Sequence, residues 1–272
     1  MFSLGFLGGG QMAETIIGGL KEKAAALNLE YLLFDPIRER RTFLHDKYDV
    51  SIMESNEDVI KSSSVLFLAV KPQIYPDVED ILAENYRSGQ IIISLMAGIP
   101  LSTLSRKLPN AKIIRIMPNT AMSVGAGVCL VTANEYVDEK EKQWVVDMLS
   151  TLGKVEEIKE TIMNGAMAIS ASGPAFFYTM IESLVLGGIE VGLTKELALS
   201  LANQTMLGAA KLLISTDAKP SQLRDAVLSP GGTTIEGVRK LEAGGFRSDI
   251  IEAVVATAEK GVALGNKSGG KI

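Results

Sequence analysis

The 272-residue chain has little of the chemistry that disulfides and metal sites require, because it contains one cysteine, Cys129, and one histidine, His45. A single cysteine excludes an intrachain disulfide and any site built from several thiolates. Metal-ligand spacing of the His/Cys kind is absent, so no metal is expected. We expect His45 to be a surface residue rather than a catalyst, since it lies in the charged stretch 38–46.

Long apolar runs and an excess of positive charge are also missing. No uninterrupted apolar run approaches the roughly 18 residues that suggest a transmembrane helix. The formal net charge is −5 without any Lys/Arg run, which disfavours nucleic acid as a partner. The apolar run 2–7 has the length of a strand and no basic region ahead of it, unlike a signal peptide. We therefore expect a cytoplasmic protein without membrane or nucleic-acid partners, long enough for two domains.

The N-terminal segment carries a glycine pattern that is typical of dinucleotide binding. An apolar run leads into GGGQMA at 8–13, which fits G-x-G-x-x-A, and an amphipathic helix follows. Gly8 would make the tight turn, Gly10 would let the backbone approach a pyrophosphate, and Ala13 would let helix and strand pack closely. The pyrophosphate would then rest on the helix N-terminus. A plain glycine-rich turn in an α/β protein is the alternative.

Apolar segments of strand length alternate with helical patterns up to about residue 160. The expected buried parallel strands, which are rich in β-branched and aliphatic residues, are Tyr31–Phe34, Val65–Val70, Ile91–Leu95 and Ile113–Ile116. The expected helices between them include Arg38–Asp46, Pro76–Tyr86 and Ser102–Leu108. This order predicts a doubly wound α/β domain of the Rossmann type over residues 1–160.

After residue 160 the pattern is helical, so the fold class is α/β followed by all-α, with a helical domain over 161–272. The expected helices, rich in Ala, Leu and Met, include Pro174–Val191, Lys195–Ile214, Gln222–Leu228 and Ser248–Leu264, and the tail Gly265–Gly270 is expected to fray. Such apolar helices bury their faces poorly alone, so we expect a homodimer or a dimer-based higher oligomer. Packing of these helices on the α/β domain is the alternative.

A second glycine-rich turn, SPGGTT at 229–234, interrupts the helical half. Pro230 cannot continue a helix, the two glycines can take backbone angles closed to other residues, and apolar spacing from Ile235 restarts a helix. Bare N–H groups and hydroxyls at a helix start form an anion site. The turn therefore predicts a clamp for a substrate carboxylate, and a loop with a Ser/Thr N-cap is the simpler alternative.

In order along the chain, several motifs resemble those of the pyrroline-5-carboxylate reductases over essentially the whole length. They are GFLGGGQMA at 5–13, LAVKPQ at 68–73, MPNT at 117–120, VGAG at 124–127, SASGPAF at 170–176, SPGGTT at 229–234 and KLEAGGFR at 240–247. The resemblance implies a Rossmann domain, a helical dimerisation domain and an active site between them. It implies NAD(P)H-dependent reduction of 1-pyrroline-5-carboxylate to L-proline, in proline biosynthesis, by an assembly of dimers.

The candidate site residues come from the two glycine turns and from the resemblance. The cofactor-binding set is Leu7, Gly8, Gly9, Gly10, Gln11, Met12 and Asp35, to which the resemblance adds Asn56, Ala69, Val70, Lys71, Pro72, Leu95, Met96 and Ala97. The substrate-binding set is Ser229, Gly232, Thr233 and Thr234, to which the resemblance adds Glu160, a carboxylate that would favour the protonated imine. No catalytic acid or base is assigned, because a protonated cyclic imine accepts hydride directly. The alternatives are a helix cap for Asn56 and solvated charges for Lys71 and Glu160.

Three positions depart from the family pattern and lose a polar group each. Met167 replaces a threonine, Phe176 a tyrosine, and Ala226 an Asn or Gln. These departures leave open a paralogue that reduces another cyclic imine carboxylate, such as the six-membered homologue, and a nucleotide-binding homologue without turnover. A β-hydroxyacid dehydrogenase would have a similar layout, but the lysine expected in its first long interdomain helix is missing from 176–192.

The residues after the second strand point to both nicotinamide cofactors. Asp35 is placed to take the ribose 2′-hydroxyl of NAD and to repel a 2′-phosphate. Arg38, Arg40 and Arg41 follow closely, and any of them could hold that phosphate, although a solvated helix face is the alternative. The family commonly uses NADPH, so we expect NADP(H), with NAD(H) also accepted.

Overall fold

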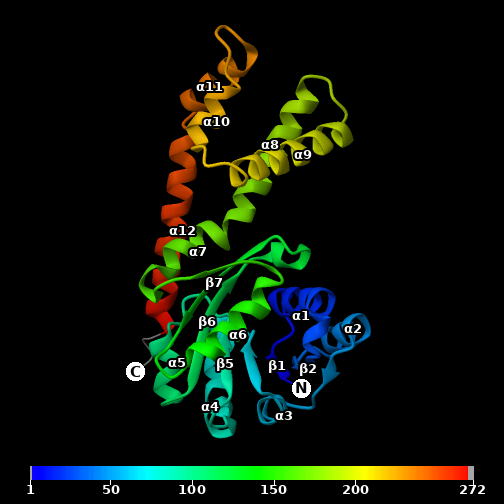
Figure 1. The fold of residues 1–272 in the computed structure, drawn as a ribbon, viewed down its shortest axis with the longest axis vertical. Coiled ribbons are helices and arrows are strands. Elements are labelled where there is room, and N and C mark those ends of the chain that lie inside the picture. Colours follow the sequence, from blue (N-terminus) through cyan, green and yellow to red (C-terminus); the bar gives the residue numbers. More distant parts are fainter. Residues whose placement is uncertain (1, 269–272) are drawn as a thin grey trace. The chain divides into compact units, whose positions relative to one another are not determined.

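The computed structural model describes residues 2–268 and divides into two compact units (Figure 1). The sheet unit comprises Met1–Ser172 together with Ala256–Ile272, and the helical unit is Gly173–Val255. The chain therefore leaves the sheet unit once and returns to it near its end. The division of the sequence into domains after residue 160 stays a prediction.

The sheet unit contains one eight-stranded sheet in the described part of the chain, with the order β3-β2-β1-β4-β5-β6-β7-β8. The strands are β1 Ser3–Leu7, β2 Glu30–Phe34, β3 Ser51–Ile52, β4 Val65–Leu68, β5 Ile91–Ser94, β6 Lys112–Pro118, β7 Gly127–Ala133 and β8 Gly153–Glu157. Strands β1 to β6 are parallel, whereas β7 runs antiparallel to β6 and parallel to β8. The carboxyl ends of β1, β2, β4 and β5 consequently lie along one edge of the sheet, which we call the carboxyl edge.

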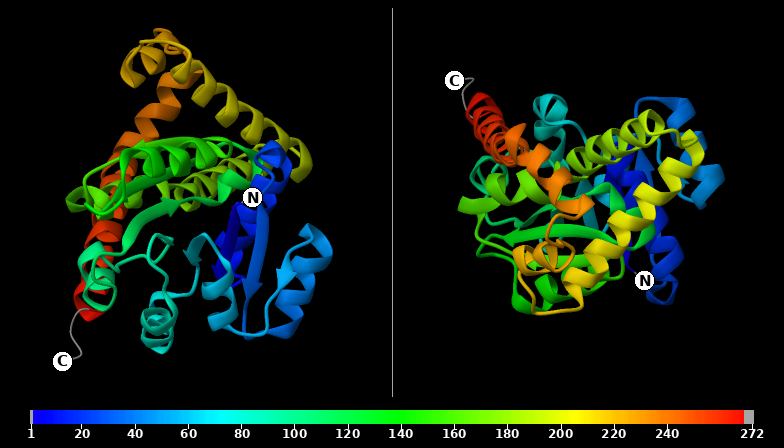
Figure 2. Two further views of the ribbon diagram at one scale, coloured as in Figure 1. Left: turned by 60° about the horizontal axis from the view of Figure 1, so that its bottom comes forward. Right: turned by 90° about the horizontal axis from the view of Figure 1, so that it is seen from above.

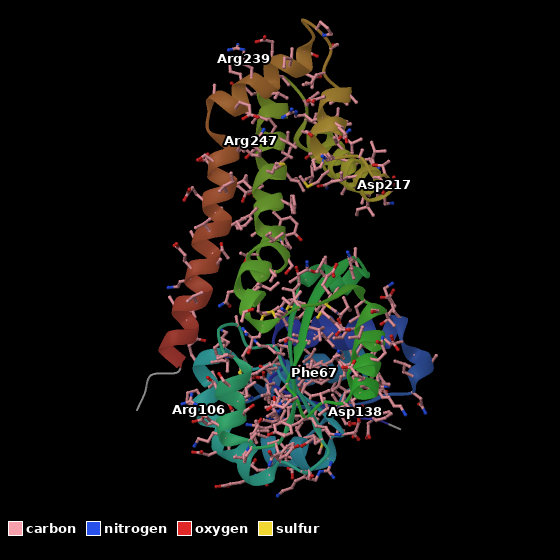
Figure 3. The ribbon with its side chains drawn as sticks, turned by 60° about the vertical axis from the view of Figure 1, so that its left-hand side comes forward. Phe67, Arg106, Asp138, Asp217, Arg239 and Arg247 are labelled. Carbon is pink, nitrogen blue, oxygen red and sulfur yellow. The ribbon has the colours of Figure 1, made fainter. Side chains whose placement is uncertain are left out.

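Helices cover both faces of this sheet, as a doubly wound fold requires. On one face pack α1 Gln11–Lys23, α2 Arg38–Tyr48 and α6 Glu139–Ser150, and on the other pack α3 Asn56–Ser62, α4 Tyr75–Asn85 and α5 Leu101–Lys107. Between the first set and the sheet, Phe6 and Phe67 from neighbouring strands stack with ring centroids 4.5 Å apart. Phe67 is labelled in Figure 3. The predicted Rossmann-type α/β domain is confirmed.

The four predicted strands Tyr31–Phe34, Val65–Val70, Ile91–Leu95 and Ile113–Ile116 are present as β2, β4, β5 and β6, with ends that differ by at most two residues. Strands β7 and β8 have no counterpart in the prediction. β8 is an edge strand with the sequence GKVEE, in which Val155 is the only large apolar residue, so it has no apolar run to reveal it.

The helical unit has a very small core. It contains α8 Gly173–Glu190, α9 Lys195–Ile214, α10 Pro220–Ala226, α11 Thr233–Ala243 and the first part of α12 Phe246–Ser268. Helices α8 and α9 form a hairpin (Figure 2), in which a Cβ at Gly188 would lie 2.8 Å from the Ala198 Cβ. Within residues 173–255 the buried apolar side chains are Val185, Ala198 and Ala202.

Many large apolar side chains of the helical unit stay exposed. On α8 and α9 they are Phe177, Tyr178, Leu184, Leu186, Ile189, Leu197, Leu199, Leu201, Leu207, Leu212, Leu213 and Ile214. By length and composition alone, the stretch Glu160–Glu190 and α9 are apolar enough to cross a membrane. Of the 18-residue apolar segment in each, 11% is buried. This surface is the one that our prediction places in contact with a second copy.

Helix α12 belongs to both units and continues through Ser268. The predicted fraying of Gly265–Gly270 is therefore wrong up to residue 268, and Gly269 and Gly270 lie outside the described residues. This part of the helix is supported because Gly265 packs directly on the connection between β5 and α5, where a Cβ at Gly265 would lie 2.8 Å from Gly98 O.

Candidate active site

The turn between β1 and α1 has the backbone that the glycine pattern predicts. Gly8 has φ +95°, a conformation that favours glycine, and its N–H donates to Phe34 O at 2.9 Å. A Cβ at Gly8 would lie only 3.0 Å from Ala69 O. Ala13 is fully buried among the core residues. The tight turn and the close helix packing expected from Gly8 and Ala13 are both present.

Gly10 directly precedes α1 and has open space where a side chain would lie. It is the N-cap residue, its helix has no side-chain cap, and a Cβ built on it would meet nothing within 4 Å. The N–H groups in the first turn of a helix have no intrahelical partner. An uncapped helix start next to open space suits a phosphate group. The residues from Gly8 to Met12 therefore fit the pyrophosphate of a dinucleotide.

Asp35 follows β2 and contacts the glycine turn. Its Oδ2 accepts a hydrogen bond from the Gly9 N–H at 2.7 Å, and its Oδ1 accepts one from the Ile37 N–H at 2.9 Å. Each carboxylate oxygen can accept a further hydrogen bond. Asp35 thus lies where an acceptor for a ribose hydroxyl is expected, and it also helps to hold the turn.

Two of the three arginines after Asp35 are used inside the protein. Arg40 Nε donates to Gly9 O, and its Nη2 pairs with Glu14 Oε2 at 2.6 Å. Arg41 Nη1 donates to Asp35 O at 2.8 Å. The exposed Arg38 makes no hydrogen bond or ion pair within residues 2–268. Arg38 is therefore the arginine of this group whose guanidinium is available to a ligand.

Glu14 is the centre of a cluster that fixes Arg40. Its carboxylate accepts hydrogen bonds from Arg40 at 2.6 Å, Lys47 Nζ at 3.0 Å and Tyr48 OH at 3.1 Å. Burial alone would raise the pKa of Glu14, but the hydrogen bonds from Arg40 and Lys47 and the charge of Arg40 outweigh it. The pKa of Glu14 consequently lies below its ordinary value. The ionised Glu14 keeps Arg40 on the glycine turn.

The other predicted cofactor loops also lie on the carboxyl edge. Ala69–Pro72 follows β4, and Leu95–Ala97 follows β5. The Ala69 N–H donates to Leu7 O at 3.0 Å and the Leu95 N–H to Leu68 O at 3.2 Å, so the loops adjoin one another through the sheet. Lys71 is exposed, Met96 is buried, and the other residues of the two loops are half-buried. The structure thus brings the glycine turn, Asp35 and both loops to one edge.

Asn56 is the first residue of α3, directly after the short connection from β3. It does not cap this helix, because Ser55 is the N-cap and its Oγ accepts from the Asp58 N–H at 3.1 Å. Asn56 is half-buried and makes no side-chain hydrogen bond to residues 2–268. Its side chain therefore remains available for the predicted contact with a nucleotide.

The predicted carboxylate clamp is an uncapped helix start. Gly231 has φ +67°, Gly232 is the N-cap of α11, and no side chain caps that helix. The Gly232 N–H donates to Ser229 O at 3.0 Å, and a Cβ at Gly232 would lie 2.1 Å from Ser229 Oγ. Thr233 and Thr234 occupy the exposed first turn. The segment thus forms a compact turn, with N–H groups and hydroxyls at the start of α11.

Two arginines near this turn are paired with acids. Arg239 pairs with Glu236 at 2.8 Å, and Arg247 pairs with Glu242; both arginines are labelled in Figure 3. Hydrogen bonds from Arg247 hold the pKa of Glu242 below its ordinary value. A bound carboxylate would therefore rely on backbone N–H groups and hydroxyls more than on a free cation.

Glu160 lies in the sheet unit, whereas Ser229–Thr234 lie in the helical unit. Its Oε1 accepts hydrogen bonds from the Leu101 N–H at 2.8 Å and from Arg115 Nη1 at 3.0 Å. Arg115 is 3% exposed. Glu160 is therefore not a solvated charge, and its Oε2 accepts no hydrogen bond from the described residues.

Sequence reasoning missed two polar residues that organise this region. Arg115, on β6, is the buried partner of Glu160. The Asn119 side chain donates to Ser170 O at 2.9 Å and accepts from the Val128 N–H at 3.2 Å, which ties the end of β6 to β7 and α7 Met163–Ser170. Asn119 could have been found from the sequence, because it belongs to the MPNT motif at the end of a strand. Arg115 lies inside a strand, and no sequence pattern marks it as a functional residue.

The three departures from the family pattern lie in different surroundings. Met167 is 8% exposed and packs with Met117, Leu130 and Met163. Phe176, on α8, is half-buried, and Ala226, which ends α10, is exposed. Met167 thus adds to an apolar cluster of the sheet unit.

Two family models match the chain. The model "NADP oxidoreductase coenzyme F420-dependent" matches residues 3–98, and the model "Pyrroline-5-carboxylate reductase dimerisation" matches residues 160–264. The first spans the glycine turn and both loops of the carboxyl edge. The second spans Glu160, the exposed apolar helices and the turn before α11, which supports a dimer-based oligomer.

Relatives match nearly the whole length. The pyrroline-5-carboxylate reductase of Synechocystis sp. is 40% identical over 264 residues, which cover 97% of this chain and 98% of the relative. The chain belongs to the pyrroline-5-carboxylate reductase family. Its Escherichia coli member is 34% identical over 258 residues, covering 94% of this chain and 96% of the relative. The crystal structure of Plasmodium falciparum pyrroline carboxylate reductase with NADP bound matches with a TM-score of 0.89 and 33% identity, covering 97% of this chain and 98% of that one.

Proposed function

We propose that this protein is an NAD(P)H-dependent reductase that converts 1-pyrroline-5-carboxylate to L-proline in proline biosynthesis. The observation that carries the proposal is the full-length match to named reductases. The open, uncapped glycine turn agrees with it, since it provides a cradle for the dinucleotide. The reaction needs a hydride on the imine carbon and a proton on the ring nitrogen.

The cofactor lies along the carboxyl edge in this proposal. Its pyrophosphate contacts Gly8–Met12, its adenosine ribose lies between Asp35 and Asn56, and its nicotinamide half contacts Ala69–Pro72 and Leu95–Ala97. When bound, the reduced nicotinamide supplies the hydride. The chain orients the reacting atoms and excludes water, which is the main contribution that hydride transfer requires from a protein. NADP(H) is the proposed cofactor, with NAD(H) also accepted.

The substrate carboxylate is bound by the first turn of α11 in this proposal. Ser229, Gly232, Thr233 and Thr234 supply hydroxyls and N–H groups, and the positive end of the α11 dipole favours an anion there. Glu160 Oε2, which accepts no bond from the described residues, is the oxygen left to favour a protonated ring nitrogen. The assembly is a homodimer or a larger oligomer built from dimers, located in the cytoplasm.

The test of the reaction is oxidation of NADPH, followed by absorbance, with 1-pyrroline-5-carboxylate and with its six-membered homologue. We expect L-proline as the product and a higher kcat/KM for the five-membered imine. A higher kcat/KM for the six-membered imine would contradict the proposed substrate. Cofactor binding by calorimetry without turnover of either imine would contradict the proposed activity altogether.

A variant pair tests whether the glycine turn binds the cofactor. Gly10→Val places a branched side chain in space that the structure leaves open, and Gly165→Val does the same on the exposed side of α7. We expect Gly10→Val to weaken NADPH binding by about a hundredfold or more, since the backbone can no longer approach the pyrophosphate. Both variants should keep a Tm within about 3 °C of the parent, a shift of the order produced by 1 kcal/mol. Parental NADPH affinity in Gly10→Val would contradict the assignment.

A further inference from the structure

The segment from Leu95 to Leu101, which we call the β5–α5 segment, is held at two points. It begins with the proposed nicotinamide contacts Leu95, Met96 and Ala97 and ends at the first residue of α5. The two points are Gly98, which meets the end of α12, and Leu101, which meets Glu160. Both contacts lie within the sheet unit as the structure divides it.

The first contact is a close approach of two backbones. Gly98 has φ +77°, and a Cβ on it would lie 3.0 Å from the Leu264 Cβ and 3.1 Å from the Gly265 N. From the other side, a Cβ on Gly265 would lie 2.8 Å from Gly98 O. Real Cβ atoms essentially never come this close to backbone, so any side chain at 265 must displace the segment or the helix.

The second contact is a buried charge pair that reaches the start of α5. The N-cap residue of α5, Pro100, offers no side-chain cap, and Glu160 Oε1 accepts the Leu101 N–H instead. The same oxygen pairs with Arg115 Nη1, and the buried Arg115 Nε has no partner within residues 2–268. A carboxylate with a buried cation as its partner is fixed in position, because moving it would leave that charge unpaired.

These two holding points coincide with the two ends of the dimerisation match, residues 160 and 264. We propose that the dimerisation region positions the β5–α5 segment through both of its ends, and thereby sets where Leu95–Ala97 meet the nicotinamide. Gly98, Gly265 and Arg115 are positioning residues in this view. The inference rests on the proposed function, since that function places the nicotinamide at this segment.

The reason to expect a kinetic effect is the steep dependence of hydride transfer on geometry. A displacement of about 1 Å at the reacting atoms can cost about a hundredfold in rate. A methyl group at 265 needs Gly98 O to retreat by several tenths of an ångström at the least, and Gly98 adjoins Ala97 in the chain. The adenine half of the cofactor site, around Asp35 and Asn56, makes no contact with Gly265 and should not change.

The experiment compares Gly265→Ala with Gly165→Ala in the full-length protein. Both glycines are helical, and a Cβ at Gly165 would meet nothing within 4 Å, so the control carries the same change of helix propensity without the contact. For Gly265→Ala we expect kcat to fall about tenfold or more. The primary isotope effect with deuterated NADPH should rise, and the affinity for 2′,5′-ADP, which lacks the nicotinamide, should stay at the parental value. Gly165→Ala should match the parent in all three.

A second pair of variants tests the other contact. Arg115→Met should raise the same isotope effect, and Arg115→Lys should restore part of the parental value, because it keeps a cation for Glu160. Loss of thermal stability without a change in the isotope effect would mean that Arg115 acts on folding alone, which would overturn its part of the inference.

The change in NADPH fluorescence on binding tests the positioning of the β5–α5 segment without requiring turnover, so it distinguishes failure of this inference from failure of the proposed reductase function. We expect Gly265→Ala to alter the fluorescence of bound NADPH, which reports the surroundings of the nicotinamide, and Gly165→Ala to leave it unchanged. A parent without reductase activity would refute the proposed function, and the fluorescence would still test the positioning. An active parent with parental kcat, isotope effect and fluorescence in Gly265→Ala would overturn the inference alone.

Discussion

Asp35 and Arg38 are the two charged residues after β2 that we propose to act on the 2′ position of the cofactor ribose. The neighbouring Arg40 and Arg41 already donate to Gly9 O and Asp35 O, whereas Arg38 has no partner in the described chain. We expect Arg38→Ala to raise the KM for NADPH about tenfold, equivalent to about 1.4 kcal/mol, and to leave the KM for NADH unchanged. Steady-state kinetics with both cofactors measures this.

Arg40→Ala is the matched comparison, and it should behave differently. Arg40 holds the glycine turn together with Glu14, so its loss should weaken both cofactors alike and lower the Tm. A selective loss of NADPH in Arg40→Ala, with Arg38→Ala unaffected, would reverse the assignment of the two arginines.

Asp35 should limit the preference for NADPH. Its carboxylate accepts a hydrogen bond from the glycine turn, and its negative charge would repel a 2′-phosphate bound there. We expect the native ratio of kcat/KM for NADPH over NADH to stay below about a hundredfold, which corresponds to roughly 2.7 kcal/mol. Asp35→Ser should raise this ratio. A native ratio above a hundredfold would show that the repulsion is ineffective.

Glu14 makes the stability of the glycine turn dependent on pH. Its pKa is lowered in the folded protein from the ordinary value of 4.5, so its contribution is present above that value and is lost as the pH falls through the folded pKa. At pH 7 we expect Glu14→Gln to reduce the free energy of unfolding by about 1–2 kcal/mol. The difference from the parent should shrink below about pH 4.5. Urea unfolding at pH 7 and pH 4 measures both values, and a difference that grows in acid would contradict the argument.

At the scale of elements, the turn before α11 depends on the missing side chain of Gly232. A Cβ there would lie 2.1 Å from Ser229 Oγ and 3.2 Å from Ser229 O, so Gly232→Ala must rotate the Ser229 hydroxyl away and crowd the turn. We expect its KM for 1-pyrroline-5-carboxylate to rise about tenfold or more while NADPH affinity is kept, because one or more hydrogen bonds to the carboxylate are lost. Gly237→Ala, on the same helix with nothing near its Cβ, is the control. Equal KM values in the two variants would show that this turn does not bind the substrate.

The elements that sequence reasoning identified were those whose pattern is local. The central strands are continuous apolar runs, and α9 was predicted with its bounds from its run of Ala, Leu and Met; the structure adds Thr194 as its N-cap. β8 was missed because it is largely polar, whereas β7, GVCLVTA, is an apolar run of strand length that the prediction passed over. The binding roles of the site residues stay predictions, although both glycine turns have the predicted backbone. Arg115 and the contact of Gly265 with Gly98 could not be inferred, since nothing in the sequence relates residues so far apart.

At the scale of the whole molecule, the exposed apolar helices predict association. Burying a Leu side chain contributes about 1.5–3 kcal/mol, and the helical unit leaves many exposed. We expect light scattering to give at least twice the chain mass of 29.1 kDa at micromolar concentration. Leu186→Lys combined with Leu201→Lys should shift the mass towards 29.1 kDa, whereas Leu27→Lys, an exposed leucine of the sheet unit, should not. A stable 29.1 kDa parent species would rule out the dimer.

The return of α12 to the sheet unit has a consequence for biosynthesis. The ribosome completes residues 1–172 long before it makes residues 256–268, so the unit that holds the glycine turn remains unfinished while residues 173–255 are made. During that interval Gly98 lacks its contact with Leu264 and Gly265, and the apolar side chains of helices 173–255 are synthesised without a surface that buries them. The sheet unit therefore cannot complete its packing at Gly98 until residues 256–268 have been made, so its folding must follow synthesis of the helical unit.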